Sequence, residues 1–326
     1  MTRRETFMAV AAGLLQACAT RVPDGGRPIE PGQAVAKVER TTVPEFFGRK
    51  GTTPGFFDGP VALSALPDGT ILVVDAGNSR IQHVSANGDP RGVFGSIGSA
   101  PGQIRFPEGI AYLPDGSVVV SDGGNNRIQF FTADGRVRGV WGRSGAGPDG
   151  FAVPRGVVIS HAGIVLVADS RNHRIQRLTT EGRFLGALGG PGDGAGEFDA
   201  PVGLAVDRSG NLAVADSGNH RVQVFDPDGL HRWTVGGIGS QPGQFRGPEG
   251  VLFDGQGRLV VADTSNDRIQ IFGLSDRVDP VPEHVIGRRG KGVREFDEPI
   301  GLAVNVQGDL LVSEYGNHRI QRVVIA

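Results

Sequence analysis

At 326 residues the chain is long enough for two average domains or for one large closed all-β domain, so length alone does not fix the domain count. Its formal net charge of -2 excludes a surface built throughout for polyanions. Hydrophobic residues at 38% exclude a disordered chain, and 53 glycines with only 6% aromatic residues suit short strands joined by tight turns.

The first 18 residues have the pattern of an export signal. Two arginines precede an apolar stretch over residues 7–15, which is too short to span a bilayer. Cys18, the single cysteine of the chain, follows Leu15-Gln16-Ala17, and this order resembles the bacterial lipobox, whose cysteine carries a lipid. The pattern predicts an exported envelope lipoprotein, facing the periplasm or the outer surface and held to its membrane by this anchor alone. An ordinary cleavage region that contains a cysteine is the alternative.

Residues 19–40 are rich in proline and glycine and are expected to form a flexible tether. From residue 41 to residue 326 the sequence repeats, with an anchor proline at steps of 47, 47, 47, 47 and 51 residues. A fixed period of this length indicates a propeller or a solenoid. The anchor prolines are Pro60, Pro107, Pro154, Pro201, Pro248 and Pro299.

Each unit contains four stretches that suit strands. A short one follows the proline, and the second is almost entirely apolar, as in residues 71–74, which is typical of a strand covered on both faces. The third alternates in polarity, as in residues 268–272, and the fourth, such as residues 139–142, leads into a glycine-rich loop. Six four-stranded units predict an all-β, six-bladed β-propeller of antiparallel strands. The four additional residues of the fifth unit fall within 273–285, where a surface connection is expected.

The last unit ends after its third strand, and its missing fourth strand is found at the other end of the repeat region. Phe47-Gly48 matches Trp141-Gly142, and each of these glycines precedes an anchor proline by twelve residues. We therefore expect residues 43–51 to complete the last blade and close the ring, which removes an open sheet edge.

An acidic residue and an arginine recur in every unit, fifteen and twenty residues after the proline. They are expected to face each other across a tight turn and to form a structural ion pair. A catalytic role is disfavoured, because catalysis needs unlike groups that converge, whereas these repeat around a ring. The pairs are Asp75 and Arg80, Asp122 and Arg127, Asp169 and Arg174, Asp216 and Arg221, Asp263 and Arg268, and Glu314 and Arg319.

The segment from Asp216 to Phe225 resembles the NHL repeat, and the resemblance extends over residues 43–326. The family forms six-bladed propellers that include RNA-binding modules, sensor domains of bacterial kinases and the lyase half of the peptide-amidating enzyme. The resemblance therefore implies the fold rather than the function.

By its resemblance to that lyase, a zinc site in this chain would use histidines near the residue after the anchor proline. No histidine occupies that position here, so no cofactor is expected. Binding of calcium or zinc in the channel is the alternative. His173, His220 and His318 share one repeat position in different blades, so they are not expected to converge on a metal. The residues after the anchor prolines are Val61, Glu108, Arg155, Val202, Glu249 and Ile300.

Three of these residues depart from the apolar pattern and are expected to ring the mouth of the central channel. Glu108, Arg155 and Glu249 predict a site for a cation, an amine or a polar small ligand, and a solvated salt bridge is the alternative. Arg171 and Tyr315 replace small residues of other blades and are expected on the same face.

Two neighbouring loops are basic and are expected to form a sector that binds a partner. An acidic protein, an anionic glycan or phospholipid head groups fit such a sector, whereas the export signal disfavours nucleic acid. A charged, solubilising rim is the alternative. The basic sector comprises Arg49, Lys50, Arg288, Arg289, Lys291 and Arg294.

Two functions follow from these features. The favoured one is a monomeric, exported binding propeller that presents its loop face and channel mouth to a protein, a glycan or a small polar ligand, with no catalytic residue. The alternative is a lyase or hydrolase, resembling peptidyl-hydroxyglycine lyase, with Glu108, Arg155 and Glu249 at its active site.

Overall fold

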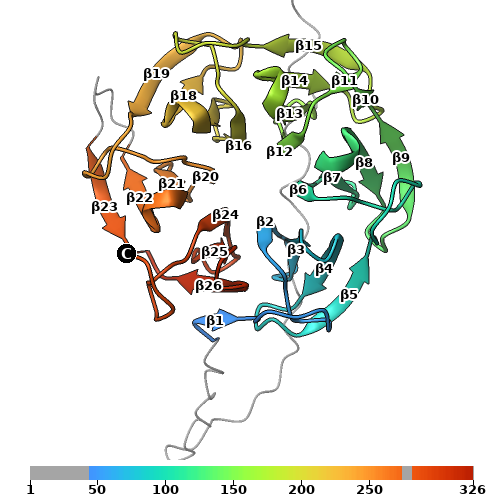
Figure 1. Ribbon diagram of the computed structural model, residues 1–326, viewed down its shortest axis with the longest axis horizontal. Helices are drawn as coiled ribbons and strands as arrows, with labels where there is room; N and C mark the ends of the chain where they lie inside the picture. The colour runs from blue at the N-terminus through green and yellow to red at the C-terminus, as the bar shows by residue number, and fades with distance from the viewer. Residues whose placement is uncertain (1–43, 274–280, 326) are drawn as a thin grey trace, which may run out of the picture. The chain divides into compact units, whose positions relative to one another are not determined.

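The computed structural model describes residues 44–273 and 281–325, which form a ring of six four-stranded antiparallel sheets (Figure 1). The ring belongs to one compact unit, Val43–Ala326. The predicted six-bladed β-propeller is confirmed. The export signal, Cys18 and the tether of residues 19–40 lie outside the described residues.

The strands of each blade follow one another from the centre of the ring outward. Blade 1 contains β2 (Pro60–Ala65), β3 (Ile71–Asp75), β4 (Arg80–Val84) and β5 (Pro90–Phe94). Blade 2 contains β6 (Pro107–Tyr112), β7 (Val118–Asp122), β8 (Arg127–Phe131) and β9 (Val137–Trp141). Blade 3 contains β12 (Pro154–Ile159), β13 (Val165–Asp169), β14 (Arg174–Leu178) and β15 (Phe184–Leu188), and a short pair, β10 (Arg143–Ser144) and β11 (Gly150–Phe151), precedes it.

The other three blades repeat this plan. Blade 4 contains β16 (Pro201–Val206), β17 (Leu212–Asp216), β18 (Arg221–Phe225) and β19 (His231–Gly236). Blade 5 contains β20 (Val251–Phe253), β21 (Leu259–Asp263), β22 (Arg268–Phe272) and β23 (Pro282–Ile286), and most of the additional residues expected in its last connection lie outside the described residues. Blade 6 contains β24 (Pro299–Val304), β25 (Leu310–Glu314), β26 (Arg319–Val323) and β1 (Phe46–Phe47).

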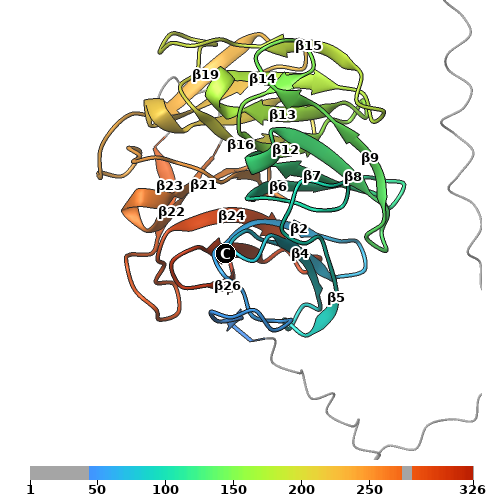
Figure 2. The same ribbon diagram turned by 45° about the vertical axis from the view of Figure 1, so that its right-hand side comes forward.

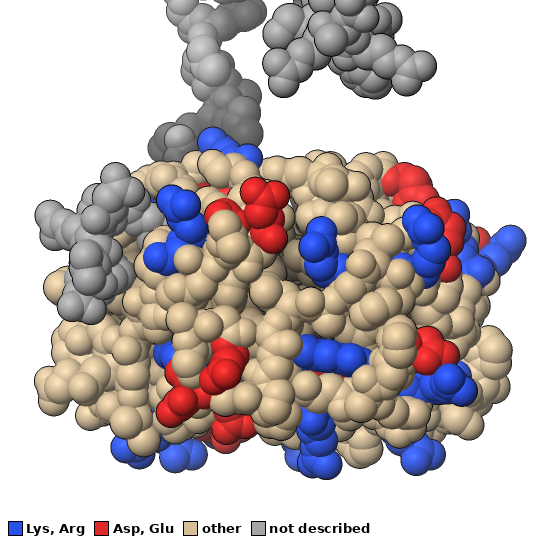
Figure 3. Space-filling view, turned by 90° about the horizontal axis from the view of Figure 1, so that it is seen from above, with Lys and Arg blue, Asp and Glu red and all other residues tan. Residues whose placement is uncertain are grey.

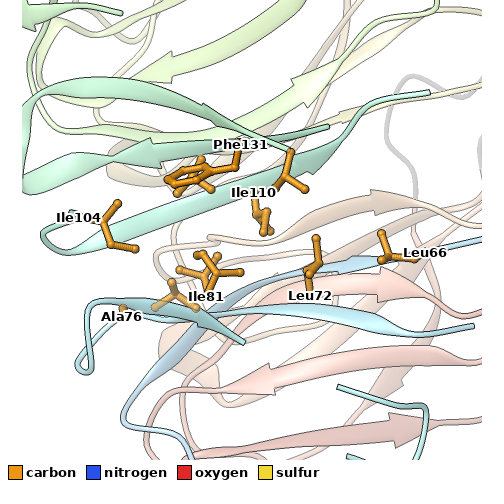
Figure 4. Close-up of a cluster of buried hydrophobic side chains, with 11 residues drawn as sticks. Leu66, Leu72, Ala76, Ile81, Ile104, Ile110 and Phe131 are labelled. Atoms are coloured by element: carbon orange, nitrogen blue, oxygen red, sulfur yellow. The ribbon is translucent and has the colours of Figure 1, made fainter. Parts of the chain in front are cut away.

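The hydrophobic core lies between neighbouring blades rather than within one. Every residue of the second strands is buried, because each of these strands is covered on both faces by adjacent sheets. Between blades 1 and 2, for example, Leu72 and Ile81 pack against Ile110 and Phe131 (Figure 4). Each blade therefore depends on its neighbours for burial of its apolar faces.

The ring closes through β1, as predicted. Phe46 and Phe47 pair in antiparallel fashion with Gln321 and Ile320 of β26, and Figure 1 shows β1 beside that strand. The backbone carbonyl of Glu45 also accepts the N–H of Arg322 at 2.7 Å. The closing strand has two residues, whereas the outer strand β9 has five, so closure depends on few backbone hydrogen bonds.

The acidic residue and arginine of each unit form a buried ion pair. In blade 1 the distance between Arg80 Nε and Asp75 Oδ2 is 2.7 Å, and Asp75 is fully buried. Its carboxylate also accepts hydrogen bonds from the side chains of Asn78 and Gln82 and from the backbone N–H of Asp58. In the other five pairs, those of Arg127, Arg174, Arg221, Arg268 and Arg319, the distances lie between 2.6 and 2.9 Å.

The arginine of each pair also ties the preceding loop to the blade. The guanidinium of Arg80 donates to the backbone carbonyls of Thr52 and Phe56 in the loop before blade 1. Because the carboxylate is fully buried and both charges are hydrogen-bonded, removal of one partner is expected to cost about 3–5 kcal/mol. In blades 2 to 5 the turn between the paired residues is a short 3-10 helix, η1 (Gly123–Asn125), η2 (Ser170–Asn172), η3 (Ser217–Asn219) or η4 (Thr264–Asn266).

The repeated histidines are contacts between blades and do not converge. Nδ1 of His220 accepts the backbone N–H of Gly247, the residue before the next anchor proline, at 3.0 Å. Asn126 Oδ1 accepts the equivalent N–H of Val153 at 2.8 Å, so an amide performs the same function. The other contacts of this kind join His173 to Ala200, Asp267 to Glu298 and His318 to Gly59.

Candidate ligand site at the channel mouth

The inner strands β2, β6, β12, β16, β20 and β24 surround the central channel (Figure 1), and Figure 2 shows β24, β2, β6, β12 and β16 following one another. Glu108 lies on β6, Arg155 lies on β12 and Glu249 lies two residues before the start of β20. The repeat places all three one residue after an anchor proline, which sets them at one level of the channel. The structure thus brings together the three residues that the sequence singled out.

Arg155 lies between the two carboxylates. Its Nε is 4.0 Å from Oε2 of Glu108, and its Nη1 is 3.5 Å from Oε2 of Glu249. The three side chains are 23 to 30% exposed, so solvent reaches them from the mouth. One guanidinium faces two carboxylates, and the cluster therefore carries a net negative charge when both glutamates are ionised.

Burial in the channel disfavours the charged form of both glutamates. It raises the pKa of Glu108, Arg155 partly opposes this shift, and the charge of Glu249 adds to it. Burial likewise raises the pKa of Glu249, against Arg155 and together with the charge of Glu298. Both carboxyl groups therefore gain from a positive charge brought to the channel.

Glycines make the channel narrow. The second residue after the anchor proline is Gly109 in blade 2, and a Cβ there would lie 2.4 Å from the carbonyl oxygen of Arg155. Neighbouring inner strands can therefore approach closely only because this position has no side chain. The channel between them encloses about 100 Å³, well below the roughly 300–1,000 Å³ of ligand pockets, so a ligand would contact the mouth. Equivalent glycines are Gly156, Gly203, Gly250 and Gly301.

The two other residues expected on this face differ in their contacts. Tyr315 is 44% exposed, and its ring lies against Gly59, where a Cβ would be 2.5 Å from the tyrosine Cε2. Arg171 lies in η2 and is exposed, and its backbone N–H donates to Ala152. Within the described ranges its guanidinium joins no ion pair with the channel carboxylates.

Sequence reasoning missed two residues at the mouth, Phe106 and Glu298, which directly precede anchor prolines. Both have left-handed backbone conformations, with φ of 45° and 52°. Phe106 is 63% exposed, and the charge of Glu298 acts on Glu249. Alignment of the residues before the prolines would have shown them, because Gly59 and Gly247 occupy this position in other blades.

Four of the six side chains of the predicted basic sector have contacts within their own loops. Arg288 pairs with Glu295 at 2.8 Å, Arg289 with Asp297 at 3.3 Å, and Lys50 with Asp58 at 3.8 Å. The guanidinium of Arg49 lies 4.1 Å from the centre of the Phe56 ring, and that of Arg294 donates to the carbonyl of Val324. For Lys291 the described contact is made by its backbone carbonyl, which accepts from Arg319. Acidic partners thus offset much of the positive charge of this sector.

No group of three or more histidine, cysteine, aspartate or glutamate side chains is arranged to hold a metal ion within residues 44–273 and 281–325. Over the same residues, no helix has the length and apolar character needed to cross a membrane.

Comparison with known proteins identifies the repeat. The model of the NHL repeat matches five segments, residues 105–131, 151–178, 198–225, 245–272 and 296–323, which fall in blades 2 to 6. Blades 2 to 6 therefore each contain one segment that matches the NHL repeat. No curated protein matched the chain by sequence.

Solved structures share the fold at low sequence identity. Virginiamycin B lyase from Staphylococcus aureus, crystallised as an inactive variant with quinupristin, has a TM-score of 0.59 and 15% identity, over 85% of this chain and 84% of that one. A gluconolactonase from Xanthomonas campestris has a TM-score of 0.61 and 15% identity, over 82% and 87% of the two chains. Hydrazine synthase from Kuenenia stuttgartiensis has a TM-score of 0.58 and 13% identity, over 83% and 96%. At these identities the likeness shows the fold alone.

Proposed function

We propose that this protein is an exported binding propeller that holds a small organic cation, such as an amine, at the mouth of its channel. The observation that carries the proposal is the convergence of Glu108 and Glu249 on the single guanidinium of Arg155. Two poorly solvated carboxylates share one counter-charge, so a second cation gains favourable electrostatic energy there.

The surroundings of this cluster suit such a ligand. Glu298 adds a negative charge near Glu249, and the exposed aromatic rings of Phe106 and Tyr315 belong to the same face. Aromatic faces attract organic cations, and the attraction grows when water is partly excluded. The export signal and Cys18 support presentation of this face outside the cytoplasm, on a lipid anchor.

Calorimetric titration with tetramethylammonium and methylammonium tests the proposal. The double variant Glu108→Gln/Glu249→Gln should bind the probes at least about tenfold more weakly, because the attracting charge is lost. Arg155→Met should bind them more tightly, because it frees both carboxylates. Arg171→Met, which removes an exposed charge from the same face, serves as the control. Equal affinity in wild type and in the double glutamine variant would refute the proposal.

The enzymatic alternative has one observation in its favour, the raised pKa of two adjacent carboxyl groups, since shifts of this kind are common in acid–base catalysts. The gluconolactonase of the same fold suggests a lactone as the trial substrate. Turnover of glucono-δ-lactone that disappears in Glu249→Gln would favour this alternative. Equal rates with wild type, with the variant and without protein would count against it.

A further inference from the structure

A groove of about 390 Å³ opens between blades 3 and 4. Its walls include the turn that joins β12 to β13 and the turn that joins β18 to β19, so it lies at the ends of the strands opposite to the anchor prolines. Its floor is apolar and includes Leu166, Ile175, Leu212 and Phe225 of the core between these blades. The volume falls within the roughly 300–1,000 Å³ typical of small-molecule sites.

Arg177, the fourth of the five residues of β14, lines this groove. In the sheet it lies between Leu166 of β13 and Gly186 of β15, so these residues form one row on one face. Gly186 contributes no side chain to the row, and a Cβ added there would meet nothing within 4 Å. Arg177 is therefore half-buried beside open space.

In two sister blades, the residue equivalent to Arg177 is polar and has a polar partner directly before the neighbouring strand. In blade 1, His83 Nε2 lies 2.6 Å from the hydroxyl of Thr70. In blade 6, Nη1 of Arg322 donates to Oδ2 of Asp309 at 3.1 Å. Thr70 and Asp309 occupy the same repeat position, ten residues after the anchor proline.

Blade 3 breaks this rule, because Ile164 stands at the partner position. Among the residues that the structure describes, Arg177 forms no ion pair, and its side chain makes no hydrogen bond. A guanidinium offers five donors in a planar fork that matches a carboxylate, so an unmatched one in a groove favours an anionic ligand. Blades 2, 4 and 5 have the apolar residues Phe130, Val224 and Ile271 at the position of Arg177.

The other polar groups of the groove are either engaged or at its rim. The carboxylate of Asp226 accepts the backbone N–H groups of Asp228 and Leu230 at 3.1 and 2.9 Å. His161 and Asp228 are exposed at the edge. Charges of both signs are interspersed over the side of the ring that carries β15 and β19 (Figure 3). No extended electrostatic field of one sign therefore selects the charge of the ligand. Selection therefore depends on local contacts with Arg177 and the apolar floor.

We infer that this groove binds an organic carboxylate with an apolar body, such as a medium-chain alkyl or an aryl carboxylate. The carboxylate accepts a bidentate pair of hydrogen bonds from Arg177, and the apolar body covers Leu188 and Val206, which line the groove and are partly exposed. Burial of apolar surface supplies affinity, and the guanidinium selects the charge and orientation of the ligand.

Calorimetric titration of the full chain with octanoate, and with octylammonium as the probe of opposite charge, tests this site. Two substitutions copy sister blades and so suit the fold. Arg177→Val copies Val224, and Ile164→Asp supplies the internal partner found at Asp309. Both should weaken octanoate binding about tenfold or more, the first by removing the guanidinium and the second by occupying it.

Wild type should bind octanoate and should prefer it clearly to octylammonium. Absence of octanoate binding, unchanged affinity in Arg177→Val, or equal binding of the two probes would each overturn the inference. Thermal unfolding of both variants checks the fold. If Ile164→Asp is unstable, octanoate binding by Arg177→Val alone decides the test. The double variant Glu108→Gln/Glu249→Gln should keep octanoate binding, which separates this site from the channel mouth.

Discussion

Two kinds of carboxylate–guanidinium contact occur in this protein, and their geometry distinguishes their roles. The repeat pairs, such as Arg80 with Asp75 at 2.7 Å, are short and buried. The contacts of Arg155 in the channel, at 4.0 and 3.5 Å, are longer and partly open to solvent. Hydrogen bonds to a charged group are usually about 2.7–2.9 Å, so the channel cluster retains unused capacity for a ligand.

The raised pKa of Glu108 predicts how stability depends on pH. A carboxyl group whose pKa is higher in the folded state contributes stability below its ordinary value of 4.5, and this contribution is lost as pH rises through the folded pKa. Glu108→Gln cannot ionise and should not show this loss. Relative to wild type, the variant should therefore become more stable as pH increases above 4.5, as measured by urea unfolding.

Glu181 supplies a control of opposite sign. Hydrogen bonds from the hydroxyls of Thr179 and Thr180 lower the pKa of Glu181, which lies on the surface. Its contribution is present above its ordinary pKa and is lost as pH falls, so Glu181→Gln should lose stability relative to wild type as pH rises. Parallel pH profiles for wild type and Glu108→Gln would contradict the expected burial of Glu108.

The residues of the channel mouth show how far the sequence predicts a site. Glu108, Arg155 and Glu249 were found because they replace apolar residues at a fixed repeat position, and the ring then brings them together. Phe106 and Glu298 occupy a position whose left-handed backbone is indicated by glycine in only two blades, at Gly59 and Gly247, so residue type gives a weak signal there. In blade 3, for instance, even the β-branched Val153 adopts it, with φ of 53°.

At the scale of strands and loops, alternation of polarity indicated the faces of a strand but not what covers them. Gln82 in β4, which follows the apolar Ile81, reads as a solvent-facing position, yet it is fully buried. Its amide donates to Asp75 and to the carbonyl of Phe56, and its side-chain oxygen accepts from Gly55. The loop that leads into the blade covers this face, and a long-range contact of this kind leaves no local signal in the sequence.

The interblade histidine contacts predict a difference between two substitutions of His220. Asparagine should preserve stability, because Asn126 makes the equivalent contact to the next blade at 2.8 Å. Alanine removes the acceptor of the Gly247 N–H and should cost about 0.5–1.5 kcal/mol. Urea unfolding of His220→Asn and His220→Ala measures both effects. Equal losses for the two variants would show that the imidazole ring contributes by packing and not by accepting this hydrogen bond.

For the whole molecule, the stability of the propeller depends on the closing of the ring. Each blade buries its apolar faces against two neighbours, and a gap would expose core residues on both of its sides. The order of blades and the closing strand followed from the repeat alone, because a fixed period and a missing fourth strand leave few arrangements. The two-residue length of β1 could not be predicted from the repeat, since hydrogen bonding at the ends of this strand depends on the neighbouring loops.

Deletion of the closing strand tests this dependence. A chain that lacks residues 1–51 loses β1, so Phe47 no longer packs with Phe57 and Ile320, and β26 presents an unpaired edge. Loss of a buried phenylalanine alone costs about 3–5 kcal/mol, and free sheet edges promote association. We therefore expect a lower thermal midpoint and concentration-dependent oligomers in size-exclusion chromatography. A chain that lacks only residues 1–42 keeps β1 and should behave as a stable propeller. If both deletions unfold at the same temperature, the contacts of β1 with β26 add nothing to the closed ring, and neighbouring blades hold it together by packing alone.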